Sequence, residues 1–135
     1  MLFRSQAPGK NPDEMVKDLL VQAKTDFDAL RLTKPENDNA LFRYRKVLEL
    51  DPENSEAQQG IRAIADRLIV LTQNATAANE FTQAEDYLSE AAAITPDAPN
   101  IQLARNELNL RKTAQEHAGA EEKARQDKAD RKSVV

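Results

Sequence analysis

The sequence predicts an all-α fold, an array of two helical hairpins followed by a fifth long helix. Two stretches repeat one pattern 44 residues apart, with alanines at positions 40 and 84 and prolines at positions 52 and 96. A fixed period is typical of stacked helical units, because each unit buries its apolar face only against a neighbour. Apolar residues also recur at helical spacing in five segments, and the chain contains only three glycines and no cysteine.

The first helix is predicted to begin at Pro12. Asn11 is a suitable cap, and Glu14 follows it at the spacing of a capping box. Pro35 is expected to stop the helix near Thr33, because proline cannot continue it. Its apolar stripe consists of Val16, Leu19, Leu20, Ala23, Phe27 and Leu30.

The second helix is expected from about residue 38 to Asp51, where Pro52 ends it. Its buried residues are predicted to be Ala40, Leu41, Tyr44, Val47 and Leu48. The third helix follows the cap at Asn54 and Ser55, with Gln58 at capping-box spacing from Ser55, and runs to about Ala78. Its stripe is Ile61, Ile64, Ala65, Leu68, Leu71 and Ala75.

The fourth helix is predicted to start with a capping box formed by Thr82 and Glu85, and Pro96 ends it. Its stripe is Phe81, Ala84, Tyr87, Leu88, Ala91 and Ile94.

The fifth helix starts near Pro99 and carries the stripe Ile101, Ala104, Leu108 and Leu110. Beyond Lys112 the sequence is polar with mixed charge. This stretch is either a solvated helix end or frayed tail, or a helix whose packing partner is not in this chain. In the second case residues 101–110 would form an interface.

Residues 79–98, from Asn79 through Tyr87-Leu88 to the closing Pro96, resemble the second helix of a tetratricopeptide repeat (TPR) with its lead-in turn. Residues 38–54 are similar in the same way. The resemblance covers most of residues 13–118, and it implies a right-handed α-solenoid. The usual TPR period is about 34 residues, so the first helix of the second unit would be longer by about three turns. Leu68 and Thr72 match the family's bulky and small positions only loosely.

Both ends of the chain differ from its middle. One set of codons for residues 1–5, and another for residues 130–135 with a stop, spells the common short-read sequencing adapter and its reverse complement. Our hypothesis is that both strings are adapter read-through around a gene fragment. The predicted organisation is a disordered N-terminal segment at 1–12, a TPR-like helical repeat domain at 13–118, and a charged helical or disordered tail at 119–135.

The charge balance argues against a nucleic-acid partner. The chain has 19 basic and 23 acidic side chains, a net charge of −4. Leaving out Arg4, Arg131, Lys132 and Asp130 lowers these to 16 and 22, a net of −6. Non-specific binding to phosphates needs a basic stripe. No apolar run approaches the roughly 20 residues that span a bilayer, so we expect no membrane insertion by this segment.

The sequence offers little for catalysis, and we expect neither an enzyme nor a cofactor or metal site. His117 is the only histidine, and it falls in the polar stretch without a nucleophile beside it. Neighbouring acids such as Glu121 and Glu122 lack the alternating oxygen ligands of a calcium loop and are interpreted as solubilising charge.

In TPR arrays the first helices line a concave face that holds a peptide. Counted by the family's spacing, the resemblance implies groove positions at Asp66, Ile69, Gln73 and Thr76, and at Lys24, Asp28 and Arg31 in the preceding unit. Mixed polar and apolar groups suit peptide recognition. The other interpretation, equally open, is that these positions are simply exposed faces of packed helices.

The resulting hypothesis is a non-catalytic protein–protein interaction or scaffold module with a protein or peptide partner, part of a larger bacterial multidomain protein. The alternative is a self-assembly element that completes its third repeat with another copy through residues 101–110. A third, enzymatic interpretation would require that neighbouring domains of the parent protein carry the chemistry. The compartment is undetermined, with the cytoplasm as the default for this segment, and the resemblance also allows a cell-envelope association of the parent.

Overall fold

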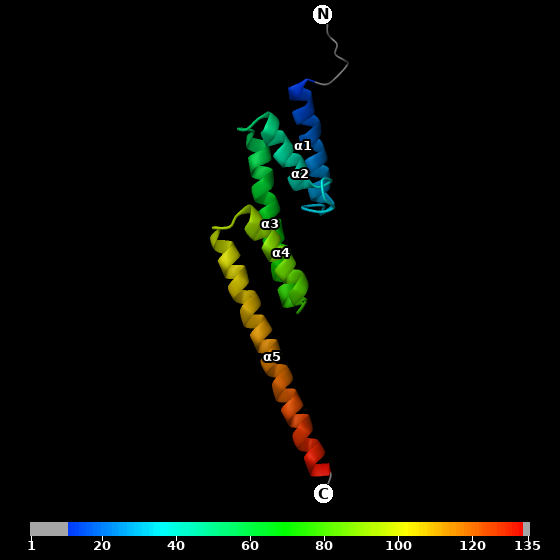
Figure 1. Ribbon diagram of the computed structural model, residues 1–135, viewed down its shortest axis with the longest axis vertical. Coiled ribbons are helices and arrows are strands. Elements are labelled where there is room, and N and C mark those ends of the chain that lie inside the picture. The colour runs from blue at the N-terminus through cyan, green and yellow to red at the C-terminus, as the bar shows by residue number, and fades with distance from the viewer. Residues whose placement is uncertain (1–10, 134–135) are drawn as a thin grey trace, which may run out of the picture. The chain divides into compact units, whose positions relative to one another are not determined.

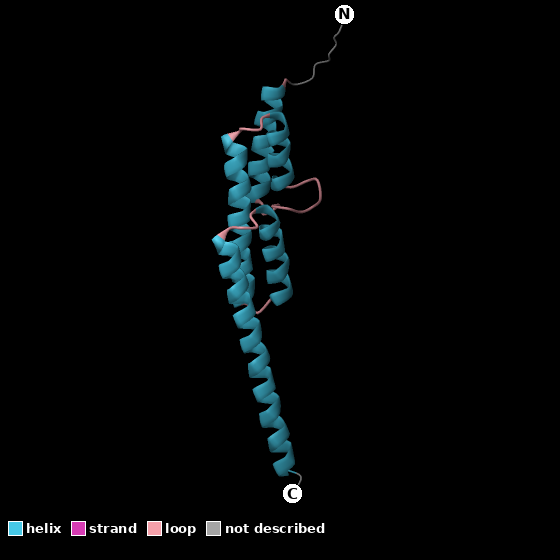
Figure 2. Cartoon of the chain, turned by 60° about the vertical axis from the view of Figure 1, so that its left-hand side comes forward, coloured by secondary structure: helices cyan, strands magenta, loops and turns pink. Residues whose placement is uncertain are grey.

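The computed structural model describes residues 11–133, and this part of the chain contains helices and no strands. The all-α class is therefore confirmed. Five helices follow one another along the chain (Figure 1): α1 (Pro12–Asp28), α2 (Ala40–Leu50), α3 (Ser55–Ala77), α4 (Phe81–Ile94) and α5 (Pro99–Ser133). The adapter-like string at 1–5 lies outside the described residues. Short connections join the helices, except for the longer loop between α1 and α2 (Figure 2).

The helices belong to two compact units that divide between Asp66 and Arg67, within α3. The first unit contains α1, α2 and the N-terminal half of α3, and α1 packs against α2. The second unit contains the C-terminal half of α3, α4 and α5, and α4 packs against the first part of α5.

Asparagine caps three of the helix starts that the sequence predicts. Asn11 Oδ1 accepts the backbone N–H of Glu14 at 2.9 Å, and Pro12 is the first residue of α1, as predicted. Asn39 accepts the N–H of Phe42 in the same way at 2.8 Å and starts α2. In each case the side chain satisfies an N–H that has no partner within the helix.

The predicted cap at Asn54 is confirmed, whereas the capping boxes expected at Ser55/Gln58 and at Thr82/Glu85 are not formed. At α3 the cap is Asn54, whose Oδ1 accepts the N–H of Ala57 at 2.8 Å, and Ser55 is already helical. At α4 the cap position is Glu80, which forms no side-chain cap hydrogen bond. Glu85 instead accepts a hydrogen bond from Lys112 at 2.7 Å, because α5 brings a cation to it. A long-range ion pair thus replaces the expected local contact.

The first helix ends at Asp28, earlier than the predicted end near Thr33. The reason is Leu30, which adopts the left-handed conformation with φ of 62°. The N–H of Arg31 then bonds to the carbonyl of Asp26 at 2.8 Å, which is the long bond of a Schellman motif. Because leucine is disfavoured in this conformation, sequence alone does not predict the stop here.

The same motif ends α3, here with a residue suited to it. Asn79 has φ of 63°, and the N–H of Glu80 bonds to the carbonyl of Ala75 at 2.8 Å. Arg111 on α5 completes the cap, since its Nε donates to Asn79 Oδ1 at 3.0 Å and its Nη2 to the carbonyl of Ala77 at 3.2 Å. The guanidinium therefore satisfies a helix-end carbonyl and joins α5 to the end of α3.

The core of the first unit combines large and small side chains. Tyr44 on α2 lies on Gly60 of α3 so closely that a Cβ at position 60 would overlap the ring. Glycine is needed here for close approach. The buried hydrophobic residues of this unit are Ala23, Leu32, Ala40, Tyr44, Val47, Ala57, Ile64 and Ala65.

The core of the second unit combines small and large side chains from α3, α4 and α5. Thr72 is fully buried and its hydroxyl donates to the carbonyl of Leu68 at 2.8 Å, so its polar group is satisfied inside the helix. The buried hydrophobic residues are Leu68, Ile69, Ala75, Ala84, Leu88, Ala91, Ile101, Ala104 and Leu108.

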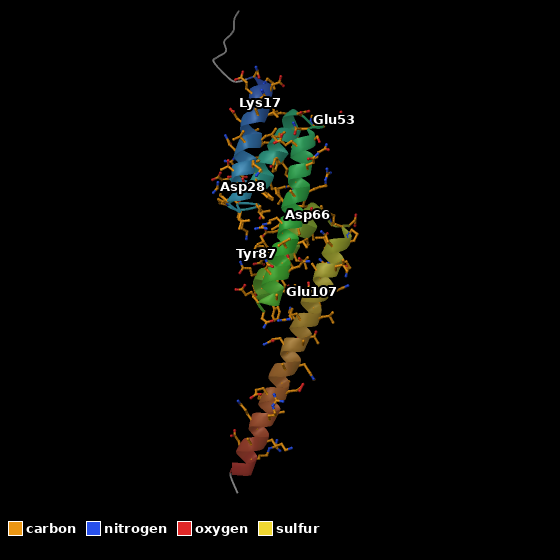
Figure 3. All side chains as sticks on the ribbon, turned by 180° about the vertical axis from the view of Figure 1, so that it is seen from behind. Lys17, Asp28, Glu53, Asp66, Tyr87 and Glu107 are labelled. Atoms are coloured by element: carbon orange, nitrogen blue, oxygen red, sulfur yellow. The ribbon has the colours of Figure 1, made fainter. Side chains whose placement is uncertain are left out.

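The C-terminal part of α5 carries side chains on all sides of the helix (Figure 3). From Asn109 to Arg131 every residue except the half-buried Lys112 is exposed. Of the alternatives for this stretch, the structure shows a continuous helix to Ser133. Its charged side chains pair along the helix, as in the contact between Arg125 Nη2 and Glu122 Oε2 at 2.9 Å.

Candidate functional site

Three of the seven groove candidates lie exposed in the first unit. Lys24 and Asp28 are one turn apart on α1 and form an ion pair at 2.8 Å (Figure 3 labels Asp28). The hydrogen bond to Asp28, and secondarily its negative charge, raise the pKa of Lys24. Asp66 is exposed on α3 and is also labelled in Figure 3. These three side chains are accessible to a partner.

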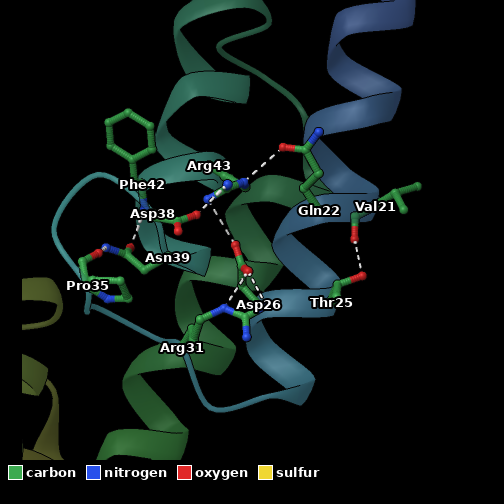
Figure 4. Close-up of polar contacts among 10 residues, drawn as sticks. All are labelled: Val21, Gln22, Thr25, Asp26, Arg31, Pro35, Asp38, Asn39, Phe42 and Arg43. Carbon is green, nitrogen blue, oxygen red and sulfur yellow. Dashed lines mark hydrogen bonds and ion pairs between the residues drawn. The ribbon is translucent and has the colours of Figure 1, made fainter.

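Arg31 is a groove candidate that the fold already uses. Its Nε donates to Asp26 Oδ1 at 2.9 Å, and its Nη2 lies 2.8 Å from the same oxygen (Figure 4). Asp26 is only 4% exposed, although it is charged. A buried carboxylate needs such partners, because desolvation otherwise costs several kcal/mol. Arg31 therefore serves the interior of its own unit.

Arg43 on α2 holds the other side of the same carboxylate. Its Nη1 lies 3.0 Å from Asp26 Oδ2, its Nη2 donates to Asp38 Oδ1 at 2.7 Å, and its Nε donates to Gln22 Oε1 at 2.9 Å (Figure 4). These contacts join α1, the following loop and α2 through one guanidinium. We call Asp26, Arg31, Asp38 and Arg43 the Asp26 cluster.

Sequence reasoning missed this cluster, and one signal could have found it. Asp26 stands three residues after Ala23 and therefore falls on the apolar side of α1. A charged residue at a core position predicts a buried pair, but the pattern does not indicate the cation that meets it.

In the second unit the structure corrects two groove candidates. Ile69 and Thr76 are buried, and the Thr76 hydroxyl forms no hydrogen bond within the described residues. They share the inward side of α3 with Leu68 and Thr72, at helical spacing. Gln73, between them in sequence, points outward and is exposed. Only Gln73 of these three is available at the surface.

The predicted association stripe on α5 is also corrected. Ile101, Ala104 and Leu108 are each 2% exposed in the second unit, where α5 packs against α4. The apolar side chains of this segment that reach the solvent are Leu103 and Leu110, which are 68% and 73% exposed. Any association through residues 101–110 would use these two leucines.

A further surface lies on the outward side of α2. A cleft between this helix and the preceding loop has the apolar side chains of Leu41 and Phe42, both half-buried, in its wall. Lys46 Nζ lies 5.5 Å from the centre of the Phe42 ring, within the range of a cation–π contact. We call this feature the α2 cleft. The sequence predicted Leu41 as core, and the structure places it at this edge of the core.

No cluster of three or more potential metal ligands occurs among residues 11–133. His117 lies on the exposed part of α5, with Nε2 3.0 Å from Glu121 Oε1. Within the described chain, no helix has the length and apolar character needed to cross a bilayer.

Comparison of this chain with models of protein families, with curated proteins and with solved structures finds no match.

Proposed function

We propose that this chain is a non-catalytic protein-binding module built from TPR-like helical hairpins. The observation that carries the proposal is a recurrence of buried positions. Ala57 and Ile64 on α3 are fully buried, and 44 residues later Ile101 and Leu108 on α5 are buried as well. Between them Gly60 corresponds to Ala104, a small residue in both cases. The period of the sequence thus recurs in the packing, as expected of repeated helical units.

The large partner of the small residue follows the same period. Tyr44 packs on Gly60 in the first unit, and the equivalent residues of the second unit, Leu88 and Ala104, are both buried. The larger Tyr44 is therefore paired with glycine, and the smaller Leu88 is paired with alanine. The combined side-chain volume of the pair changes little between the two units.

The outer part of α5 departs from the repeat in a way that favours a surface role. Leu68 and Thr72 are buried on α3, but the residues 44 positions later are Lys112 and Glu116. A further hairpin of the same kind would have to bury these charges, at a cost of several kcal/mol. Terminal units of repeat proteins have such polar outer faces. We therefore propose that partners are bound through exposed side chains rather than by extension of the core.

The proposed contact residues are the exposed members of the predicted groove: Lys24, Asp28, Asp66 and Gln73. Arg31 is excluded as a probe because its replacement would uncover Asp26. The test is selection of random peptides displayed on phage against the wild-type chain. We then measure the affinity of each selected peptide for Lys24→Ala and Gln73→Ala, with Arg105→Ala on α5 as a control at another exposed site.

Peptides that bind the wild-type chain and lose affinity in Lys24→Ala or Gln73→Ala, but not in Arg105→Ala, would support the proposal. A selection that enriches no peptide over an unrelated helical protein would overturn it.

The second candidate function is self-assembly, which the exposure of Leu103 and Leu110 favours. They stand seven residues apart, two helical turns, and so lie on one side of α5. Analytical ultracentrifugation of the wild-type chain and of Leu103→Glu/Leu110→Glu tests this function. A concentration-dependent dimer that the double variant abolishes would support it, and a monomer over the accessible concentration range would exclude it.

A further inference from the structure

The α2 cleft lies on the side of α2 opposite to the core. Ala40, Tyr44 and Val47 face inward and are buried, whereas Arg45 and Lys46 face the solvent. The cleft is bounded on its other side by the loop that precedes the helix. Its lining residues are Thr33, Lys34, Glu36, Asn37, Asn39, Leu41, Phe42, Arg45, Lys46 and Glu49.

Hydrogen bonds fix the shape of this cleft. The buried side chain of Asn39 accepts the N–H of Phe42 and donates from Nδ2 to the carbonyl of Pro35, both at 2.8 Å (Figure 4). The N–H of Leu41 bonds to the carbonyl of Leu32 at 3.0 Å. These hydrogen bonds hold the loop against the first turn of α2. The cleft is therefore ordered before a ligand binds, which lowers the entropic cost of binding.

The charges of the cleft favour an acidic ligand. Lys34, Arg45 and Lys46 line it together with two acids, Glu36 and Glu49. This local excess of positive charge occurs on a chain whose net charge is −4. Lys46 is 3.6 Å from Glu49, and both side chains are exposed, so this pair is weak and easily exchanged.

Arg45 supplies an exposed cation to the wall of the cleft. Its guanidinium is exposed, and it forms no ion pair or hydrogen bond with any residue between 11 and 133. A free guanidinium presents a planar fork that matches a carboxylate with two parallel hydrogen bonds. The half-buried Phe42 ring in the same wall offers an apolar contact, which adds affinity that charge alone does not supply.

We propose that the α2 cleft binds an acidic peptide segment, with an apolar side chain of the peptide on Phe42 and a neighbouring carboxylate on Arg45. This inference rests on the proposed function, because it names the partner chemistry of one protein-binding surface. The lining of this cleft contains none of the predicted groove residues Lys24, Asp28, Asp66 and Gln73. The backbone of a nucleic acid carries a negative charge at every nucleotide, and the two acids in the lining would repel it.

The test is fluorescence anisotropy with a labelled peptide of about twelve residues that carries glutamates around a leucine–phenylalanine pair. We expect Arg45→Glu to weaken binding about tenfold or more, because an attraction becomes a repulsion. Phe42→Ala should weaken it about fivefold to tenfold through lost apolar contact. Circular dichroism of each variant shows whether the first unit is still folded, and Phe42→Leu keeps the apolar wall if the alanine variant unfolds.

The matched control is Arg62→Glu, the same charge change at an exposed position of α3 in the same unit. Binding to this variant should stay within about twofold of the wild-type value, since exposed charges away from the contact act weakly. Equal losses of peptide affinity in Arg45→Glu and Arg62→Glu would overturn the proposal, because they would show that the acidic peptide is attracted to any positive charge on the first unit. Tighter binding of a single-stranded oligonucleotide than of the peptide would also overturn it.

Absence of peptide binding at about 1 mM, where the binding free energy would be only about 4 kcal/mol, would refute this inference alone. The proposed function would still stand if display selection yields peptides that depend on Lys24 or Gln73. A display selection that enriches no peptide would instead reject the protein-binding role itself.

Discussion

The Asp26 cluster should determine the stability of the first unit, and Asp26→Asn tests this role. The substitution keeps the shape of the side chain but removes its charge and turns one acceptor into a donor. The new amide would face either the guanidinium of Arg31 or that of Arg43, and donors cannot pair with donors. One cation would thus lose its partner in a region where Asp26 itself is 4% exposed.

The two arms of the cluster contribute unequally to the expected loss. The Arg31 side chain is 43% exposed, so its pair with Asp26 counts largely as a surface contact of about 0–1 kcal/mol. Arg43 is 19% exposed, and loss of a buried partner costs about 3–5 kcal/mol for a fully desolvated pair. With partial exposure of Arg43 we expect a loss of about 2–4 kcal/mol, a large part of the about 5–15 kcal/mol that stabilises a typical domain.

The assay is urea denaturation followed by tyrosine fluorescence. The chain has two tyrosines and no tryptophan, so Tyr87→Phe leaves Tyr44 as the only fluorescent reporter, inside the core of the first unit. Asp28→Asn is the matched control. Its pair with Lys24 is exposed, and we expect a change within about 0.5 kcal/mol. If Asp26→Asn and Asp28→Asn unfold at the same urea concentration, the cost of desolvating Asp26 equals the energy gained from its ion pairs. The Asp26 cluster would then not stabilise the first unit.

Gly60→Ala should destabilise the first unit by about 1–3 kcal/mol through overlap with the Tyr44 ring, and Tyr44→Leu in the same chain should restore part of the loss in a urea titration; an additive double variant would contradict this. Burial raises the pKa of Tyr44, so the folded state favours the neutral phenol. The contribution of Tyr44 to the stability of the first unit is fully present below the usual pKa of 10.0 and is lost as the pH rises through the higher pKa of the folded state. Melting temperatures measured against pH for the wild-type chain and for Tyr44→Phe will show this loss. Leu108→Ala should cost the second unit about 2–5 kcal/mol and the exposed Leu103→Ala under about 0.5 kcal/mol, measured by Tyr87 fluorescence in a Tyr44→Phe background; equal losses would contradict the burial of Leu108. Arg111→Ala should speed amide hydrogen exchange at the end of α3, because a carbonyl there loses its donor, and unchanged exchange would count against this cap.

The helix starts, and the helix ends set by proline, could be predicted from the sequence, because the signals that set them act within one turn. Asn11 followed by Pro12 starts α1, and Pro99 starts α5, as predicted. Pro52 and Pro96 end α2 and α4 for an equally local reason, since the residue before proline avoids helical geometry. The all-α class follows from these signals and the apolar spacing.

The exposure of the proposed groove residues was predictable only in part. Lys24, Asp28, Asp66 and Gln73 are exposed and accessible to a partner, whereas Thr76 is in the core. A count along one helix identifies which residues share a side of it. It does not identify which side the neighbouring helices cover, and packing decides that.

Tertiary structure alone decided which distant partners the charged side chains contact. Arg43 reaches Gln22 across 21 positions of the chain, and Arg111 reaches Asn79 across 32. Such contacts form only once hairpins have closed, and no local pattern encodes them. The backbone of Leu30 was also unpredictable from local sequence, because its left-handed conformation is intrinsically unfavourable for leucine. The hydrogen bond from the N–H of Arg31 to the carbonyl of Asp26 stabilises it. The sequence by itself determined where the helices begin and where proline ends them, because those signals are local. Packing determined where α1 stops and which charged and apolar side chains remain available to a partner.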